Sequence, residues 1–275
     1  MKKLLTLLLT VAIAAVSALS LSACGDKQGT LVVYTQAGFP PFESIKGGKI
    51  VGVDVEIMNK VGEKLNKKVV FEDVDFDLII DAVAEGKLCN VGAAGISITE
   101  ARKEKVNFSN EYYTAALYVI YKTAEESNYL TTTSDGEQGV YWGSLAGKHI
   151  NVQGGTTSDL FLIDELAEGG TLYNTGATKG DFTELAFAVA DLNGEGDVLI
   201  IDELPAKKLI EGHSELKCAP LYWEGEDGDD DEAAVDTYAI CVTKGQDAIL
   251  NAINEVLAEL GESGIQALVN KYLGI

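Results

Sequence analysis

Short apolar runs alternate with segments of helical periodicity along the first half of the chain. The runs predict buried strands at 31–35, 69–71 and 91–94. Between them, apolar residues recur every four positions from Val53, which predicts an amphipathic helix, and a second helix is expected at 76–85. Strands and helices in alternation indicate a parallel sheet covered on both faces.

The alternation breaks off and then restarts in the second half. After an expected strand at 117–121, the polar stretch 127–143 shows no periodicity. The restart predicts a second α/β lobe. Its expected strands lie at 150–152, 198–201 and 216–219, and its expected helices at 159–167, 182–192 and 204–211.

The last elements are a strand at 238–242 and helices at 246–260 and 263–273, which are too few for a third domain. We therefore expect them to return to the first lobe, so that the chain crosses between the lobes twice. The expected fold class is α/β, with two Rossmann-like lobes. Open α/β sheets bind ligands at the carboxyl ends of their strands, which is where we expect a cleft.

The residues that follow the predicted strands have the chemistry of a ligand site. Aromatic side chains, bare backbone, hydroxyls and a carboxylate all occur there. In the second lobe, a glycine turn at a helix start is suited to an anion, but it lacks the lysine of a phosphate loop. The candidate residues are Gln36, Phe39, Phe76, Ala94, Gly95, Ser97, Gly155, Thr156, Thr157 and Asp202.

Arg102 is the most unusual of the candidates. Thr99 is an expected N-cap, which places Arg102 in the first helical turn, where a cation costs about 0.3–1 kcal/mol. A bound carboxylate would compensate, whereas the alternative is an exposed ion pair with Glu100 or Glu104. Asp202 would bind an ammonium, or would cap the helix that follows it. Together these groups describe a site for an α-amino acid.

The amino terminus has the pattern of a secretory signal. Two lysines precede an apolar run from Leu4 to Leu19, and the sequence LSAC at 21–24 resembles a bacterial lipobox. We expect a signal peptide at 1–23, a lipidated Cys24 as membrane anchor and a tether at 24–29. The alternative is an uncleaved membrane helix. The lipoprotein prediction places the mature chain on the outer face of the cytoplasmic membrane.

Charge and cysteine spacing exclude several other classes of protein. The formal net charge of −22 becomes −24 without the signal peptide, which removes two lysines and no acids, so nucleic acid is a poor partner. Cys89, Cys218 and Cys241 remain after Cys24, and their spacing fits neither a metal site nor a disulfide framework. We expect free thiols, although one bridge stays open. The acidic run 227–231 lacks the glycine and distal glutamate of a calcium loop, so we expect the loop at 224–232 to be solvated.

Several motifs occur in an order that resembles a known family, the polar amino-acid binding proteins of ABC importers, or type 3 extracellular solute-binding proteins. The resemblance covers almost the whole mature chain. The motifs are GFPPFE at 38–43, VGVDV at 51–55, FDLII at 76–80, GISIT at 95–99 through Arg102, Phe108-Ser109 with Tyr112-Tyr113, LAGK at 145–148 before GTT at 155–157, and DVLIID at 197–202.

The resemblance implies a two-lobe Venus flytrap of the type II periplasmic-binding-protein class. Lobe I would comprise 30–112 and 237–275, and lobe II 113–236, with hinge strands near 112–118 and 232–238. Arg102 would bind the ligand carboxylate with backbone N–H groups of Ser97 and Thr157. Gly95, Ser97 and Asp202 would hold the ammonium, and Phe39 and Phe76 would enclose the side chain.

We therefore predict a substrate-binding lipoprotein that delivers a free amino acid to a membrane permease, as a monomer and without a cofactor or metal. Gln36 stands where basic-amino-acid binders of this family often carry an acid, so a neutral polar ligand such as glutamine is favoured, with cystine and histidine open. At Cys89 and Asn90 the chain also departs from the family pattern. The alternatives are an enzyme resembling the cyclohexadienyl or arogenate dehydratases on the same fold, and an amino-acid sensor.

Overall fold

The computed structural model describes residues 29–225 and 230–275. The predicted signal peptide and Cys24 lie outside the described residues, as does most of the predicted tether. Gly29, which we expected at the end of that tether, instead begins strand β1 (Gly29–Thr35). Within the described ranges, no helix combines the length and apolarity needed to span a bilayer.

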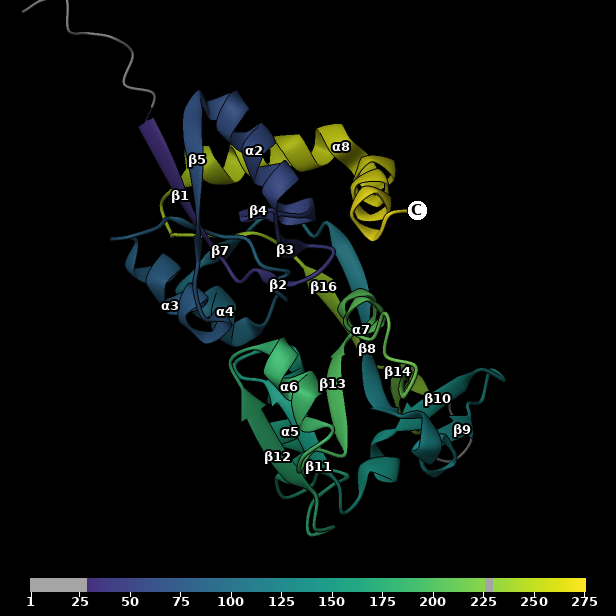
Figure 1. Ribbon diagram of the computed structural model, residues 1–275. Coiled ribbons are helices and arrows are strands. Elements are labelled where there is room, and N and C mark those ends of the chain that lie inside the picture. Colours follow the sequence, from purple (N-terminus) through teal and green to yellow (C-terminus); the bar gives the residue numbers. More distant parts are fainter. Residues whose placement is uncertain (1–28, 226–229) are drawn as a thin grey trace, which may run out of the picture.

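The first lobe is built on a five-stranded sheet (Figure 1). Strand β1 runs parallel to β5 (Lys67–Asp73) and to β6 (Val91–Gly92). Strand β17 (Cys241–Val242) comes from the far end of the chain and pairs antiparallel with both β6 and β7 (Asn107–Phe108). The C-terminal segment therefore completes the first sheet, as the sequence predicted.

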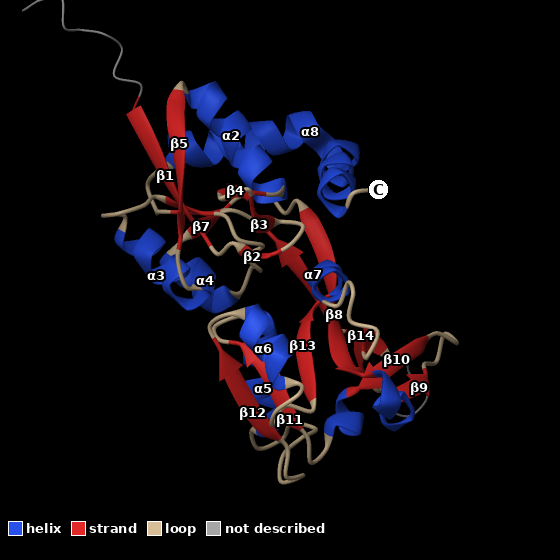
Figure 2. Cartoon of the chain, in the orientation of Figure 1, coloured by secondary structure: helices blue, strands red, loops and turns tan. Residues whose placement is uncertain are grey.

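Helices cover this sheet. Helix α2 (Val53–Leu65) packs against α8 (Asp247–Leu273), while α3 (Phe76–Glu85) contacts β1, β6 and β17 (Figure 2). The short α4 (Glu100–Lys105) lies beside α3. A small antiparallel sheet of β2 (Gly38–Phe39), β3 (Glu43–Lys46) and β4 (Lys49–Val51) leads into α2.

The second lobe contains a nine-stranded sheet around the long strand β8 (Tyr113–Lys122). Strands β11 (His149–Gln153), β12 (Thr178–Phe182) and β13 (Val198–Asp202) run parallel, so their carboxyl ends meet at one edge. The remaining elements are β9 (Leu130–Thr132), β10 (Gln138–Tyr141), β14 (Leu216–Trp223), β15 (Glu232–Ala233), β16 (Val235–Tyr238), α5 (Thr157–Leu166), α6 (Leu185–Asp191), α7 (Glu203–Leu209) and the 3₁₀ turns η1 (Thr123–Asn128) and η2 (Trp142–Leu145).

Two antiparallel strands, β8 and β16, connect the lobes (Figure 1). The first four residues of β8 pair with β16, and the next residues pair with β13 of the second lobe. An aromatic cluster lies at this crossing, where the Tyr238 ring meets the buried Phe42 edge-on at 4.9 Å and Tyr113 at 5.7 Å. Such aromatic pairs add to the free energy of apolar burial, so they brace the crossing strands against lobe I.

The two-lobe α/β fold is confirmed, and most predicted elements form where expected. Two local predictions are wrong. The stretch 127–143 contains the edge strand β9 and the four-residue strand β10, which lies between β9 and β14 and is too short to show a period in the sequence. The helix expected at 182–192 starts only at Leu185, because 178–182 forms the polar edge strand β12. The two C-terminal helices form as predicted, because the segment labelled α8 consists of two helices that meet at a kink at Gly261, whose φ of 58° is not helical.

The structure also describes the cysteines, which we expected to be free thiols, and part of the acidic loop, which we expected to be solvated. Cys89, Cys218 and Cys241 are free thiols, as favoured from their spacing. Asp231 does not behave as a solvated loop residue, because it accepts hydrogen bonds from Ser134 N (2.6 Å), Tyr141 Oη (2.5 Å) and Gly225 N (3.0 Å). These bonds lower the pKa of Asp231 to about 2, and the bond from Tyr141 has the largest effect.

Candidate functional site

A small cavity of about 20 Å³ lies between the lobes at the carboxyl ends of their strands. Most of the residues predicted from the sequence line it, together with Gln153, which was not predicted. Arg102 and Gly155 instead line an adjoining groove that shares Phe76 with the cavity. The cavity is lined by Gln36, Phe39, Phe76, Ala94, Gly95, Ser97, Gln153, Thr156, Thr157 and Asp202.

Arg102 is buried, so its interpretation as an exposed ion pair is wrong. The neighbouring Lys103 pairs with Glu100 instead. Thr99 caps the helix as predicted, since its Oγ1 accepts from Arg102 N at 3.2 Å. The guanidinium donates to the carbonyl of Ser97 in lobe I and, at 2.8 Å, to that of Gly155 in lobe II. Arg102 therefore links the two lobes across the cleft.

Two further groups surround the Arg102 guanidinium. The Phe76 ring lies 5.6 Å from it, within the range of a cation–π contact. Burial lowers the pKa of Arg102, and the nearby carboxylate of Asp236 opposes that effect. An arginine retains its charge under such conditions, so a buried cation faces a carboxylate at this point.

Asp202 stands at the end of the buried strand β13. It occupies the N-cap position of α7, but its side chain accepts no capping hydrogen bond, so the capping alternative is not realised. Burial, and then the charge of Asp236, raise the pKa of Asp202 to about 7. The Tyr238 hydroxyl is close enough to oppose this rise, but neither it nor Asp202 Oδ1 has a hydrogen-bond partner among the described residues.

Asp236 was not predicted as a site residue, although it lies in an expected hinge strand. It is buried on β16 and accepts a short hydrogen bond from Thr157 Oγ1. The Ser97 hydroxyl lies 3.3 Å from that of Thr157, so residues of both lobes meet here. Burial raises the pKa of Asp236, while Thr157, Ser97 and Arg102 oppose the rise. The sequence signal was an acid within the otherwise uncharged strand segment that runs into Tyr238.

Phe39 and Phe76 both line the cavity, and Phe39 is also part of the hydrophobic core. Phe39 lines the cavity, yet it is buried and packs against Phe42 and Tyr238, with centroid distances of 5.9 and 6.1 Å. Phe76 is only partly buried and lies between the cavity and Arg102. Both rings are therefore fixed walls of the cavity.

The backbone at Gly95 is held open toward the cavity. Its φ of +54° favours glycine, and an added Cβ would lie only 2.7 Å from Cε1 of Phe39. The Gly95 N–H donates to Asp54 Oδ2 at 3.0 Å, and Tyr112 Oη donates to Asp54 Oδ1 at 2.6 Å. Burial raises the pKa of Asp54 to about 6, and these two bonds oppose the rise. The anchored turn leaves the Gly95 carbonyl free to accept a bond.

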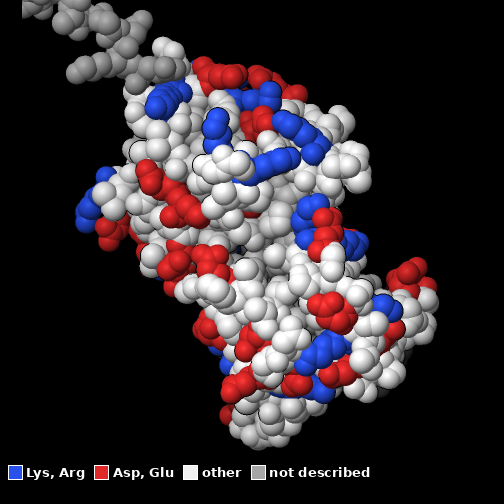
Figure 3. All heavy atoms as spheres, in the orientation of Figure 1, with Lys and Arg blue, Asp and Glu red and all other residues white. Residues whose placement is uncertain are grey.

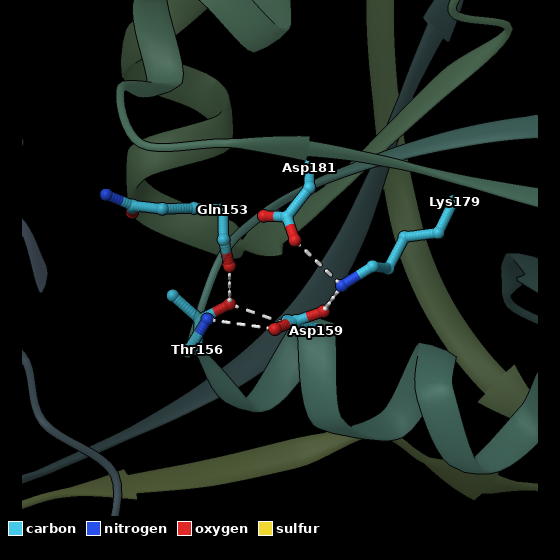
Figure 4. Close-up of polar contacts among 6 residues, drawn as sticks. Gln153, Thr156, Asp159, Lys179 and Asp181 are labelled. Carbon is cyan, nitrogen blue, oxygen red and sulfur yellow. Dashed lines mark hydrogen bonds and ion pairs between the residues drawn. The ribbon is translucent and has the colours of Figure 1, made fainter. Parts of the chain in front are cut away.

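The second-lobe turn is fixed by charged groups behind it (Figure 4). Thr156 caps α5, accepting from Asp159 N and donating to the Gln153 carbonyl at 2.7 Å. Asp159 accepts from Gly155 N at 2.9 Å and pairs with Lys179, which also bonds Asp181. The same turn therefore both caps α5 and lines the cavity. Within the described ranges, no cluster of residues suited to a metal ion occurs.

The fold and cleft define a class of two-lobe solute-binding proteins. Residues 31–275 match the family of bacterial extracellular solute-binding proteins, family 3, and the chain belongs to that family.

Individual relatives agree with this assignment. The chain is 25% identical to the L-cystine-binding protein TcyJ of Escherichia coli, over 96% of this chain and 93% of that protein. It is 32% identical to the arginine-binding extracellular protein ArtP of Bacillus subtilis, over 61% and 68% of the two chains. Among solved structures, arginine-bound AbpA of Streptococcus pneumoniae is 25% identical with a TM-score of 0.74, over 90% of this chain and 95% of that chain.

Proposed function

We propose that this protein captures a free L-α-amino acid between its lobes and delivers it to the permease of an ABC importer. We also propose that it works as a monomer, held at the outer face of the cytoplasmic membrane by a lipidated Cys24. The observation that carries the binding proposal is the buried Asp202 carboxylate, whose Oδ1 has no partner among the described residues. A buried carboxylate in a cavity without a partner is suited to a ligand cation.

Two groups of residues in and beside the cavity suit the two charges of an α-amino acid. Asp202, the Ser97 hydroxyl and the Gly95 carbonyl are acceptors for an ammonium. Arg102 and the Thr157 hydroxyl already face a carboxylate, that of Asp236, which supports the view that this donor group accommodates anions. The backbone N–H groups of Ser97 and Thr157 would be further donors to the ligand carboxylate, as the resemblance implies.

The names of the relatives support amino acids as the ligand class. ArtP binds arginine and TcyJ binds cystine, and one solved neighbour is an ancestral arginine-binding protein bound to glutamine, 29% identical with a TM-score of 0.69. Closure would follow from binding, because a ligand that contacts both lobes stabilises the closed state by those differential contacts.

The main alternative is an enzyme, since a carboxyl group with a pKa of about 7 also suits general acid catalysis. We favour binding because the unpaired carboxylate lines the same cavity as the Ser97 and Thr157 hydroxyls, next to the groove that holds the Arg102 guanidinium. Turnover of prephenate or arogenate by the purified protein would support the enzyme. A sensor would leave amino-acid uptake unchanged when its gene is deleted, whereas an importer subunit would not.

A thermal-shift screen tests the proposal. The full-length chain is expected to melt several degrees higher with at least one of the twenty amino acids, cystine, ornithine or citrulline. At a ligand concentration of 100 Kd, binding adds about 2.7 kcal/mol to the free energy of unfolding. Decarboxylated and deaminated analogues of the same ligand serve as controls and should give no shift. The absence of a shift with any α-amino acid would contradict the proposal.

Lobe closure can be tested at Gly155. A Cβ added there would lie 3.0 Å from the Cβ of Asp77 on the opposite lobe, so Gly155→Ala is expected to weaken amino-acid binding about tenfold by overpacking the closed interface. Gly212→Ala is the matched control, because Gly212 has φ +87° against +75° at Gly155 but no atom within 4 Å of its added Cβ. Both variants carry the backbone strain, and only Gly155→Ala should lose affinity. Equal affinities in calorimetry would show that the lobes do not close at this contact.

A further inference from the structure

One wall of the cavity is built from two glutamines with a glutamate behind them. Gln36 and Gln153 line the cavity from opposite lobes and are almost fully buried, 2% and 3% exposed. The Gln36 amide donates from Nε2 to Glu184 Oε2 at 3.1 Å, across the cleft. The Gln153 amide donates from Nε2 to the carbonyl of Thr183, the residue before Glu184, at 2.8 Å.

These bonds fix the orientation of both amides. A backbone carbonyl and an ionised carboxylate only accept hydrogen bonds, so each glutamine must turn its NH₂ group toward its anchor. The two Oε1 atoms then remain as the free ends, and no hydrogen bond to either is found among the described residues. The glutamine wall, Gln36 and Gln153, therefore offers acceptors to a ligand.

The surroundings of the glutamine wall are acidic. Burial, and then the charges of Asp73 and Asp75, raise the pKa of Glu184. Within the part of the chain that the structure describes, no salt bridge reaches these three carboxylates. Figure 3 shows acidic side chains gathered at one side of the junction between the lobes.

The charges of the buried side chains in the cleft also favour a positively charged ligand. Arg102 is one cation against two buried carboxylates, Asp202 and Asp236. A neutral amino acid adds one charge of each sign, which leaves an excess of negative charge that Glu184 increases. A ligand with an additional positive charge offsets that excess.

We propose that the cavity takes an amino acid with a cationic side chain, an ammonium or guanidinium, which the Oε1 atoms of the glutamine wall bind from both lobes, while the Glu184 carboxylate bonded to Gln36 adds negative charge behind them. This inference rests on the proposed function and replaces the neutral polar side chain that Gln36 alone favours. A guanidinium or ammonium carries only donors, matching the free Oε1 atoms, whereas a glutamine side chain would bring a carbonyl oxygen to a wall of acceptors.

Arginine and citrulline provide the direct test on the unchanged protein, because the ureido group has the shape of a guanidinium without its charge. Calorimetry is expected to show arginine binding at least about tenfold more tightly than citrulline. Lysine is expected to exceed norleucine by at least about the same factor. Citrulline or glutamine binding as tightly as arginine would overturn the inference and leave the proposed function intact. Failure of every amino acid to bind would instead overturn the proposed function.

Glu184→Gln tests the glutamate itself. The variant keeps the shape of the side chain, and it is expected to reduce the ratio of arginine to citrulline affinity about tenfold while citrulline binding changes little. Glu195→Gln, at an exposed position of the same lobe between α6 and β13, removes the same net charge and should leave the ratio unchanged. An unchanged ratio in Glu184→Gln would show that another group recognises the cation. Equal melting temperatures without ligand would establish that both variants are folded.

Discussion

Asp202→Asn is expected to weaken amino-acid binding by about 2–5 kcal/mol while making the ligand-free protein more stable. The two effects have one cause. Asp202 is a buried carboxylate whose Oδ1 has no partner among the described residues, so its charge destabilises the empty site and stabilises the occupied one. A residue needed only for packing would lose both affinity and stability.

The effect on stability depends on pH in a defined direction. The pKa of Asp202 is raised from 3.8 in a free side chain to about 7 in the folded protein. The folded state therefore holds a proton that the unfolded state has lost between these values, and stability falls as the pH rises from about 4 to about 7. Above pH 7 the Asp202→Asn variant avoids a cost on the order of 4 kcal/mol, so its melting temperature should be higher than that of the unmodified protein. Near pH 4 the two melting temperatures should be equal.

Ligand affinity should depend on pH in the opposite sense. Only the ionised carboxylate pairs with an ammonium, so binding by the unmodified protein is expected to weaken by up to about tenfold for each pH unit below 7. Calorimetry at several pH values measures this for both proteins. Asp164→Asn, an exposed acid on α5, is the charge-matched control and should change neither property. A variant that binds normally would place the ammonium elsewhere.

The location of the site could be predicted from the sequence because it follows from topology. Parallel strands end at one edge of a sheet, so the residues after the apolar runs of each lobe lie together, and Gly95 of lobe I and Asp202 of lobe II both line the cavity. Arg102 was unusual for a local reason, its place in the first turn after the Thr99 cap. Strand ends and helix starts are short-range features that a sequence displays directly.

The partners that complete the site could not be predicted in the same way. Asp236 bonds to Thr157, 79 positions away, and Glu184 bonds to Gln36, 148 positions away. The first contact joins the hinge strand β16 to α5, and the second crosses between the lobes, so no local pattern encodes either of them. The edge strands β9 and β12 were missed because strands with a solvent-facing edge need no apolar run, and β10 was missed because its four residues are too few to show a period.

Arg102→Ala is expected to weaken amino-acid binding by about 2–5 kcal/mol and, unlike Asp202→Asn, to destabilise the closed protein as well. Without the guanidinium, the buried Asp236 loses the cation that faces it, and the Ser97 and Gly155 carbonyls lose their donors. Small-angle scattering should therefore show a more open ligand-free molecule, while calorimetry measures the lost affinity.

Two further variants separate the charge of Arg102 from its geometry. Arg102→Lys keeps the charge but cannot span two carbonyls and a carboxylate at once, so it should recover less than half of the lost binding free energy. Lys105→Ala, on the same helix, removes a cation that pairs with Asp81 at the surface and should have little effect. Full recovery by lysine would mean that the site needs only a positive charge. Unchanged binding in Arg102→Ala would mean that the ligand carboxylate is held by the α5 terminus alone, and that Arg102 serves lobe closure only.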